Sequence, residues 1–166
     1  MTKGRYARYA RPVATAAALA VAIAALGTTM TDLGPWYQSL QVPPWKPPDW
    51  LFGPAWTTIF ACAAMSASRA WVHAPSQLYR ARLLALFLIN GLLNLAWSAL
   101  FFAAHRPDWA MNEVVLLWAS ILTLLVYTWR ASPFASLLLV PYLAWVSFAG
   151  VLNWHVVKLN APFGAG

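Results

Sequence analysis

Charged residues are scarce in this chain of 166 residues, in which Asp, Glu, Lys and Arg together make up 9%. A soluble domain of similar length typically carries about 25% charged residues, so a soluble fold could not cover its surface with polar groups. The chain also has only one cysteine, Cys62, which excludes an internal disulfide. The scarcity of charge therefore excludes an ordinary soluble domain and favours a membrane protein.

Long apolar runs fill most of the chain, and none has Asp, Glu, Lys or Arg in its interior. Each is near the roughly 20 residues that a helix needs to cross the hydrocarbon layer. The five runs cover residues 12–31, 51–71, 83–104, 114–129 and 132–157. They are continuous and lack the period-two alternation of strands. We therefore predict an all-α membrane protein, a bundle of five transmembrane helices in a single domain spanning residues 1–166.

The first run follows a basic N-terminal arm, residues 1–11, and resembles the start of a signal peptide. Its length, and the lack of a clear small-residue cleavage site before a polar start, favour a retained helix. Basic residues also indicate orientation through the excess of Lys and Arg on the cytoplasmic side. On one side lie Lys3, Arg5, Arg8, Arg11, Arg69, Arg80, Arg82 and Arg130; on the other lie Lys46, Arg106 and Lys158. This asymmetry predicts a cytoplasmic N-terminus in a bacterial inner membrane, and it accounts for the net charge of +7 without a nucleic-acid partner.

The connection between the first two runs, residues 32–50, reads DLGPWYQSLQVPPWKPPDW. Pro43, Pro44, Pro47 and Pro48 forbid regular helix there and stiffen the backbone, and the segment carries four aromatic residues. We interpret it as a rigid lid on the side opposite the N-terminus. Lys46 in this lid is a candidate partner for an anionic ligand.

Groups for conventional chemistry are missing. The runs hold no buried carboxylate or amine, which ion-coupled transporters usually place near the midplane, and the sequence has no phosphate-binding, dinucleotide or zinc motif. His73, His105 and His155 lie near the ends of the expected helices, and we interpret them as interfacial residues. No metal site is expected.

Two amides and several aromatic residues are the candidates for binding. Asn90 and Asn94 are four residues apart and share a helix face, and Trp97 continues the same stripe. In hydrocarbon such amides need partners. They either join helices, at about 1 kcal/mol each, or orient a ligand in an apolar pocket; the residues alone leave both interpretations open.

Two further stripes can meet this one. Residues of the fifth run recur at intervals of three, four and four: Tyr142, Trp145, Ala149 and Asn153. In the second run Trp56, Phe60 and Ala64 share a face. If the stripes converge, they line a flat aromatic cavity roofed by the lid, although plain helix packing gives the same periodicity.

Three ordered motifs resemble the TspO/MBR family of tryptophan-rich sensory proteins, also known as translocator proteins and peripheral-type benzodiazepine receptors. They are WYQSLQVPPWKPPDWLFGPAWTTIF, then NLAWSALFF, then VPYLAWVSFAGVLNW. The resemblance covers about residues 36–160. Two positions depart from the family pattern. Phe60 stands where many relatives have Tyr, and Trp154 replaces the central Tyr of the mammalian cholesterol motif, which makes sterol binding an unsupported expectation.

The resemblance implies a five-helix bundle, commonly a homodimer, with a ligand cavity beneath the first loop. Ligands of the family are protoporphyrin IX, haem, and isoquinoline carboxamide and benzodiazepine drugs, and no cofactor is required. The ligand-binding residues that it implies, together with the amide stripe, are Trp45, Trp56, Asn94, Trp97, Tyr142, Trp145 and Ala149.

Three functions stay open at this point. The first is a membrane sensor or regulator that binds tetrapyrroles. The second is an enzyme that degrades protoporphyrin IX in light, for which the resemblance assigns catalytic roles to Trp56 and Trp145. The third is facilitated transport of porphyrins or lipids between the helices.

Overall fold

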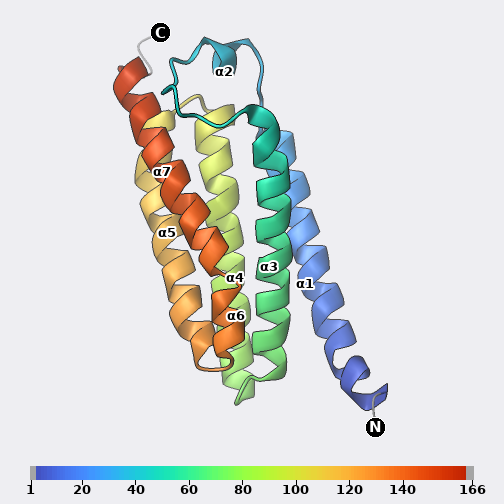
Figure 1. Ribbon diagram of the computed structural model, residues 1–166. Coiled ribbons are helices and arrows are strands. Elements are labelled where there is room, and N and C mark those ends of the chain that lie inside the picture. The colour runs from blue at the N-terminus through green and yellow to red at the C-terminus, as the bar shows by residue number, and fades with distance from the viewer. Residues whose placement is uncertain (1–2, 164–166) are drawn as a thin grey trace.

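The computed structural model describes residues 3–163, with side chains from Ala10 onward. Its long helices are α1 (Lys3–Met30), α3 (Phe52–Val72), α4 (Gln77–Ser98), α5 (Pro107–Trp129) and α7 (Val140–Asn160), which lie side by side in Figure 1. Shorter elements are α2 (Pro35–Ser39) and α6 (Pro133–Leu137), a 3-10 turn at Asp49–Leu51 and a π-helical turn at Ala99–Ala103. No strand occurs within residues 3–163, so the all-α prediction is confirmed.

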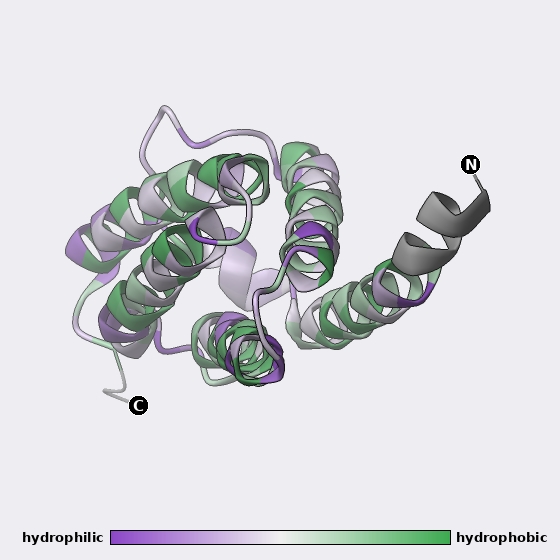
Figure 2. Cartoon of the chain, turned by 90° about the horizontal axis from the view of Figure 1, so that it is seen from below, coloured by the Kyte–Doolittle hydropathy of each residue, from purple (hydrophilic) through white to green (hydrophobic). Residues whose placement is uncertain are grey.

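The long helices form a closed ring in the order α1, α3, α7, α5, α4. Helix α1 packs on α3 and touches α4, α4 packs along α5, α5 packs along α7, and α7 returns to α3. Figure 2 shows this arrangement along the bundle from below. The ring order differs from the chain order, because α4 lies beside α1 and α7 lies beside α3.

Four segments of the described chain are long and apolar enough to cross a membrane: Ala10–Met30, Gln77–Ala103, Pro107–Trp129 and Pro133–Asn160. Helix α3, with 21 residues, is long enough but less apolar. It contains Ser, Thr and Arg69, and its hydroxyls are satisfied within the protein. Thr57 donates to the Gly53 carbonyl at 2.9 Å, and Ser66 donates to the Ala135 carbonyl at 2.7 Å. Helix length and hydropathy thus support four of the five expected transmembrane spans.

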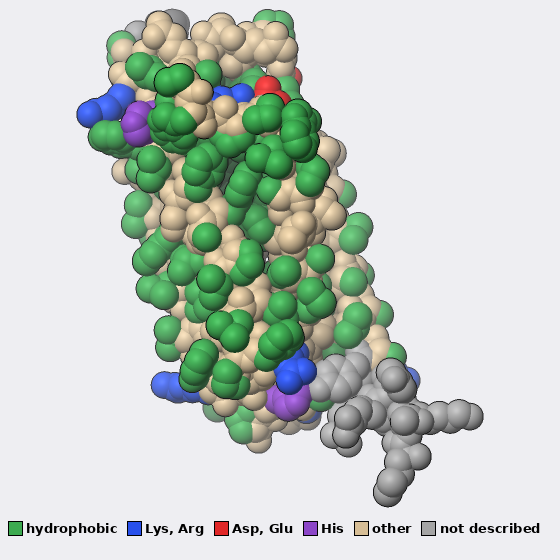
Figure 3. Space-filling view, viewed as in Figure 1, with side chains coloured by type: hydrophobic (Ala, Val, Ile, Leu, Met, Phe, Trp, Pro, Cys, Tyr) green, Lys and Arg blue, Asp and Glu red, His purple; other side chains and the backbone are tan. Residues whose placement is uncertain are grey.

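The outer surface of the bundle is apolar over its middle. Large hydrophobic side chains point outward there, including Val21 at 68% exposure, Leu92 at 66% and Val115 at 59%. On the face seen in Figure 3, Lys, Arg, Asp, Glu and His side chains gather at the two ends, and the band between them is hydrophobic. Such a surface is stable in lipid but not in water. The chain is a multi-pass membrane protein.

Two helices begin before the apolar runs that indicated them. Helix α4 begins at Gln77, where the Ser76 hydroxyl caps the helix by accepting from the Tyr79 amide at 3.1 Å. Helix α5 begins at Pro107, seven residues before the expected start at 114, and proline suits a first helical position because it has no amide to satisfy. The earlier start places Glu113 inside α5.

The fifth run is not one continuous helix. It divides into α6 and α7, with a turn at Leu138 and Leu139. Pro141 has no amide to donate to the carbonyl of Leu137, so the helical ladder cannot continue across this point. The turn lets α6 pack against α5 and α3 while α7 crosses the bundle.

The core lies where α3, α5 and α7 meet. Its buried members are Ile59, Val114, Leu117, Ile121, Tyr142 and Val146. Because lipid tails are as apolar as these side chains, their contribution in a membrane comes from close packing rather than from removal of water. Gly91 allows a similar close approach of α4 to α1, since a Cβ atom there would lie 2.4 Å from Cδ1 of Ile23.

Candidate functional site: a cavity inside the bundle

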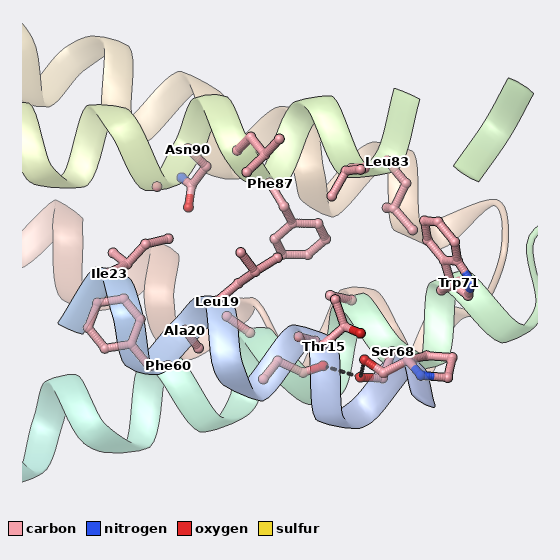
Figure 4. Close-up of a pocket in the computed structure, with 18 of the residues that line it drawn as sticks. Thr15, Leu19, Ala20, Ile23, Phe60, Ser68, Trp71, Leu83, Phe87 and Asn90 are labelled. Carbon is pink, nitrogen blue, oxygen red and sulfur yellow. Dashed lines mark hydrogen bonds between the residues drawn. The ribbon is translucent and has the colours of Figure 1, made fainter. Parts of the chain in front are cut away.

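A cavity of about 470 Å³ lies among α1, α3 and α4. This volume falls in the range of about 300–1,000 Å³ that is usual for small-molecule sites. Figure 4 shows Leu19 and Ile23 of α1, Phe60 of α3, and Phe87 of α4 around the cavity. Small residues of α3, Ala63, Ala64 and Ala67, line another part of its wall, and their short side chains leave this space open.

A polar cluster adjoins this apolar space. Asn90, Asn94 and Tyr142 line the cavity and are buried, with exposures of 5%, 7% and 2%. The Asn94 amide donates to the Tyr142 hydroxyl at 3.3 Å, and the Asn90 amide donates to the Ser120 hydroxyl at 2.8 Å. Both asparagines therefore form hydrogen bonds between helices, which supports the interpretation that they join helices. Because they also line the cavity, a ligand-orienting role stays a prediction.

The space beneath the lid is much smaller. A pocket of about 50 Å³ lies there. Its lining includes Tyr37 and Lys46 of the lid, Trp97 of α4 and Ala149 of α7. The lid packs closely on the helix ends, where Trp36, Tyr37 and Leu40 contact a cluster of Phe101, Ala110 and Val156.

The predicted binding residues divide between these two regions. Asn94 and Tyr142 line the large cavity, whereas Trp97 and Ala149 line the small pocket under the lid. Neither lining includes the other three, Trp45, Trp56 and Trp145.

Ring contacts connect two of these tryptophans, Trp56 and Trp145, to residues that line the two regions. Trp56 stacks on Phe60 with ring centroids 5.5 Å apart and meets Tyr142 edge-on at 6.0 Å. It therefore lies directly behind the wall of the large cavity.

Trp45 and Trp145 lie on the lid side and share a neighbour. Trp45 meets Phe148 at 5.8 Å between ring centroids, and Trp145 meets the same ring at 5.6 Å. The indole nitrogen of Trp145 is buried without a hydrogen-bond partner, as is that of Trp97. Of these two unsatisfied donors, that of Trp97 belongs to a residue that lines the lid pocket, whereas Trp145 lines neither space.

Asn153, the last member of the fifth-run stripe, forms hydrogen bonds to the backbone of another helix. It is 1% exposed, and in the amide orientation that satisfies both of its polar atoms it donates to the Pro107 carbonyl at 3.2 Å and accepts from the Met111 amide at 3.1 Å. Its side chain thus attaches α7 to the first turns of α5.

Glu113 corrects the expectation that no helix carries a buried carboxylate. It is 8% exposed, and neither carboxylate oxygen has a hydrogen-bond partner. It lies on the inward stripe of α5 with Ala110 and Leu117. The expectation was wrong because the fourth apolar run was started at 114, directly after this residue. The spacing of Ala110, Glu113 and Leu117 was the signal that could have revealed it.

The lid is fixed by polar contacts at several points. The Tyr37 hydroxyl and the Lys46 ammonium both donate to Oδ1 of Asp49. The hydrogen bond from Lys46 lowers the pKa of Asp49. Partial burial alone would lower the pKa of Lys46, but the hydrogen bonds to Asp49 and Tyr37 raise it. Burial and the bond to Asp49 raise the pKa of Tyr37. Lys46 is thus already paired.

Two other contacts hold the lid to the helix ends. The Asn160 side chain of α7 accepts a hydrogen bond from the backbone N–H of Gln41 and donates one to the backbone carbonyl of Gln41, both at 2.8 Å. The Trp36 ring stacks on His105 with centroids 4.1 Å apart. His105 has a positive φ of 53°, which ends the π-helical turn after α4 and directs its ring toward the lid.

Comparisons with known proteins identify relatives over most of this chain. A model of the TspO/MBR family matches residues 14–159. The chain is 41% identical over 149 residues to the tryptophan-rich protein TspO of Chlorobaculum tepidum, covering 86% of this chain and 91% of that protein. It is 37% identical over 142 residues to protein CrtK of Rhodobacter capsulatus, covering 84% and 89%.

The similarity extends to animals. The chain is 33% identical over 132 residues to the human translocator protein, covering 79% of this chain and 78% of that protein. The matched region includes all of the long helices except the first residues of α1 and the last of α7, together with the lid. The chain belongs to the TspO/MBR family.

Proposed function

We propose that this protein is a tetrapyrrole-binding sensor or regulator whose five long helices all span the membrane, with protoporphyrin IX or haem bound inside the bundle. The observation that carries this proposal is the cavity of about 470 Å³ among α1, α3 and α4. Phe60, Phe87 and Trp71 give it aromatic side chains, and the Asn90–Asn94–Tyr142 cluster gives it polar groups. Aromatic rings suit the faces of a flat apolar molecule, and a few polar groups orient it.

Binding is tested by quenching of tryptophan fluorescence with protoporphyrin IX, on protein in nanodiscs of neutral lipid, with empty discs as the background. The informative variant is Ala64→Phe, which places a ring in the cavity. Its matched control is Ala61→Phe, one turn away on α3 at an exposed position outside the cavity lining. We expect saturable quenching for the wild type and the control, and a loss of about tenfold or more in affinity for Ala64→Phe. Equal affinity of all three proteins would exclude this cavity.

The lid side is examined separately with the Trp56→Phe/Trp145→Phe variant. Trp145 lies near the lid pocket, so an effect of this variant together with full binding by Ala64→Phe would move the ligand toward the lid. Illumination of the same complexes tests the enzymatic alternative. Loss of the porphyrin absorbance bands that depends on the two tryptophans would make the protein an enzyme, whereas a spectrum as stable as that of free porphyrin supports binding alone.

Glu113 favours transport as a second candidate. A buried carboxyl group without a partner inside a spanning helix is the kind of group that transporters use for coupling. Porphyrin flux into sealed proteoliposomes should then respond to an imposed pH difference in the wild type and lose this response in Glu113→Gln. Flux that is equal in both proteins, or absent from both, removes this candidate.

The proposed orientation places the N-terminus of α1 in the cytoplasm and the lid on the opposite side, in a bacterial inner membrane. The excess of basic residues at the lid-distal end supports it. Homodimerisation is proposed from family membership and is measured by size-exclusion chromatography with light scattering in detergent.

A further inference from the structure

The large cavity has one charged residue among the described residues that line it, and that residue is Arg11. Arg11 lies near the start of α1 and Trp71 lies in the last turn of α3, so this end of the cavity faces away from the lid. Along α1 the lining extends from Arg11 to Ile23, about 18 Å at 1.5 Å per residue. The cavity is therefore an elongated apolar space with a cation at one end and amides near the other.

Two other arginines at this end of the bundle, Arg69 and Arg80, have different roles. Nε of Arg69 donates to the Ser132 hydroxyl at 3.0 Å, and its guanidinium lies over the Phe134 ring. Nε of Arg80 donates to the Trp71 carbonyl at 3.3 Å. Neither lines the cavity. No carboxylate of the described residues forms an ion pair with Arg11, so its guanidinium is available to a ligand.

A ligand that carries carboxylates needs such a group. Burying an unpaired carboxylate against apolar walls is strongly unfavourable, and arginine is the side chain best suited to bind one, through two parallel N–H donors. At the lid, Lys46 is already paired with Asp49 and Tyr37. The cation at the lid-distal end is thus the better match for the acidic edge of a porphyrin.

We propose that Arg11 binds a carboxylate of the ligand, so that a diacid tetrapyrrole lies in the cavity with its propionate edge toward the N-terminal end of α1. This inference rests on the proposed function and adds to it the chemical group that is recognised and the direction in which the ligand lies. A long arginine side chain at this depth keeps its charge near the membrane interface while its stem follows apolar surface. The propionates then stay close to water and the macrocycle lies deeper.

The test combines two ligands with three proteins. Protoporphyrin IX and its dimethyl ester are titrated into wild type, Arg11→Gln and Arg82→Gln in neutral-lipid nanodiscs at about pH 8, where ordinary carboxyl groups are ionised. Arg82 is the matched control because it is exposed at the same end of the bundle and does not line the cavity. Empty discs correct for partition of each ligand into lipid.

We expect the wild type and Arg82→Gln to bind the diacid about tenfold more tightly than the ester, the ratio that corresponds to one charge-assisted hydrogen-bonded pair. In Arg11→Gln the two ligands should bind equally, because only the diacid loses a partner. A preference for the diacid that persists in Arg11→Gln, or equal binding of both ligands to the wild type, would overturn the role of Arg11 and leave the proposed function intact. Absence of saturable binding by either ligand would overturn both.

Discussion

Polar side chains inside the bundle fall into two groups. Asn90, Asn94 and Asn153 each form hydrogen bonds to another helix. The other group consists of the Glu113 carboxylate and the indole nitrogens of Trp97 and Trp145, which are buried without partners. A buried polar group without a partner costs about 1–3 kcal/mol, and more when it is charged. The second group therefore marks positions where stability is lower than packing alone would allow.

Replacing Glu113 by leucine should stabilise the protein. The change removes two unpaired oxygens and keeps a similar size and helix propensity, so we expect the free energy of unfolding to rise by about 1–3 kcal/mol. Thermal unfolding in a mild detergent, followed by near-ultraviolet circular dichroism, measures the effect.

Asn153→Leu is the comparison for this prediction. It also replaces a buried polar group in the bundle, but one whose two hydrogen bonds attach α7 to α5. It should lower the melting temperature. If Glu113→Leu lowers the melting temperature as Asn153→Leu does, the carboxyl group has a stabilising partner in the membrane, and the assignment of Glu113 as unpaired fails.

At the scale of elements, the lid is held by a small charged cluster whose behaviour with pH follows from its pKa values. The pKa of Asp49 is lowered in the folded protein. The stabilisation that its carboxylate gives the lid is therefore present above the ordinary pKa of an aspartate, and it is lost as the pH falls through the lowered value. The pKa of Lys46 is raised in the folded protein. The stabilisation that its ammonium gives the lid is therefore present below the ordinary pKa of a lysine, and it is lost as the pH rises through the raised value. The cluster is therefore intact across the neutral range.

We expect hydrogen exchange of the lid amides, corrected for intrinsic rates, to be constant between about pH 5 and 9. Asp49→Asn should accelerate this exchange by removing the negative charge of the acceptor that Tyr37 and Lys46 share. The effect should correspond to no more than about 1 kcal/mol, because the Asp49 side chain is half exposed. Mass spectrometry of lid peptides provides the measurement.

Asp108→Asn serves as the control for the lid. It removes the same charge at the same end of the bundle, but Asp108 pairs with Arg106 at the start of α5 rather than with the lid. Exchange in the lid should be unchanged in this variant. Equal acceleration by both substitutions would mean that net charge, rather than the cluster around Asp49, controls the lid.

The sequence predicted a helix wherever apolar residues were continuous, but it did not predict the residues at which the helices begin and end. The run from 114 indicated α5 but missed its first two turns, because Asp108 and Glu113 interrupt the apolar pattern. The division between α6 and α7 was also missed, because Leu137, Leu138 and Leu139 continue the apolar pattern through the turn. Hydropathy reports the environment of a residue, whereas a helix end depends on caps and prolines.

The candidate site was predictable in part. Periodicity correctly placed Asn90 and Asn94 on one face, and both line the large cavity. It could not show which helix lies opposite, so it could not reveal that the cavity is formed with α1, whose Ala-rich sequence gave no signal. Trp56 and Trp145 instead pack against Tyr142 and Phe52, contacts that depend on the tilt of α7 and are absent from any single-helix pattern.

For the whole molecule, the number of spans is the property to measure first. Helix α3 lies in the ring between α1 and α7, yet it is not among the four segments of the described chain that are long and apolar enough to cross a membrane. If α3 spans the membrane, Ser39 in α2 and Gln77 at the start of α4 lie on opposite sides. Single cysteines at these positions in a Cys62→Ala background should react with an impermeant maleimide from opposite faces of vesicles, and Gln77→Cys from the cytoplasmic face.

Labelling of both cysteines from the same face would leave four spans and contradict the five-helix proposal. Labelling from opposite faces, but with Ser39→Cys accessible from the cytoplasm, would keep five spans and reverse the orientation. Permeabilised vesicles, in which both positions should react, control for burial of either cysteine.

Helix α1 closes one side of the cavity, yet none of its side chains from Ala10 to Met30 is buried. Moving α1 away from the cavity would therefore expose the fewest buried side chains. The lid, by contrast, is held by contacts at Asp49, Asn160 and His105. A ligand that exchanges past α1 is drawn from the bilayer, where hydrophobic compounds accumulate. Its occupancy then follows the amount dissolved per lipid, so adding lipid at a constant total amount of porphyrin should empty the site as effectively as removing porphyrin.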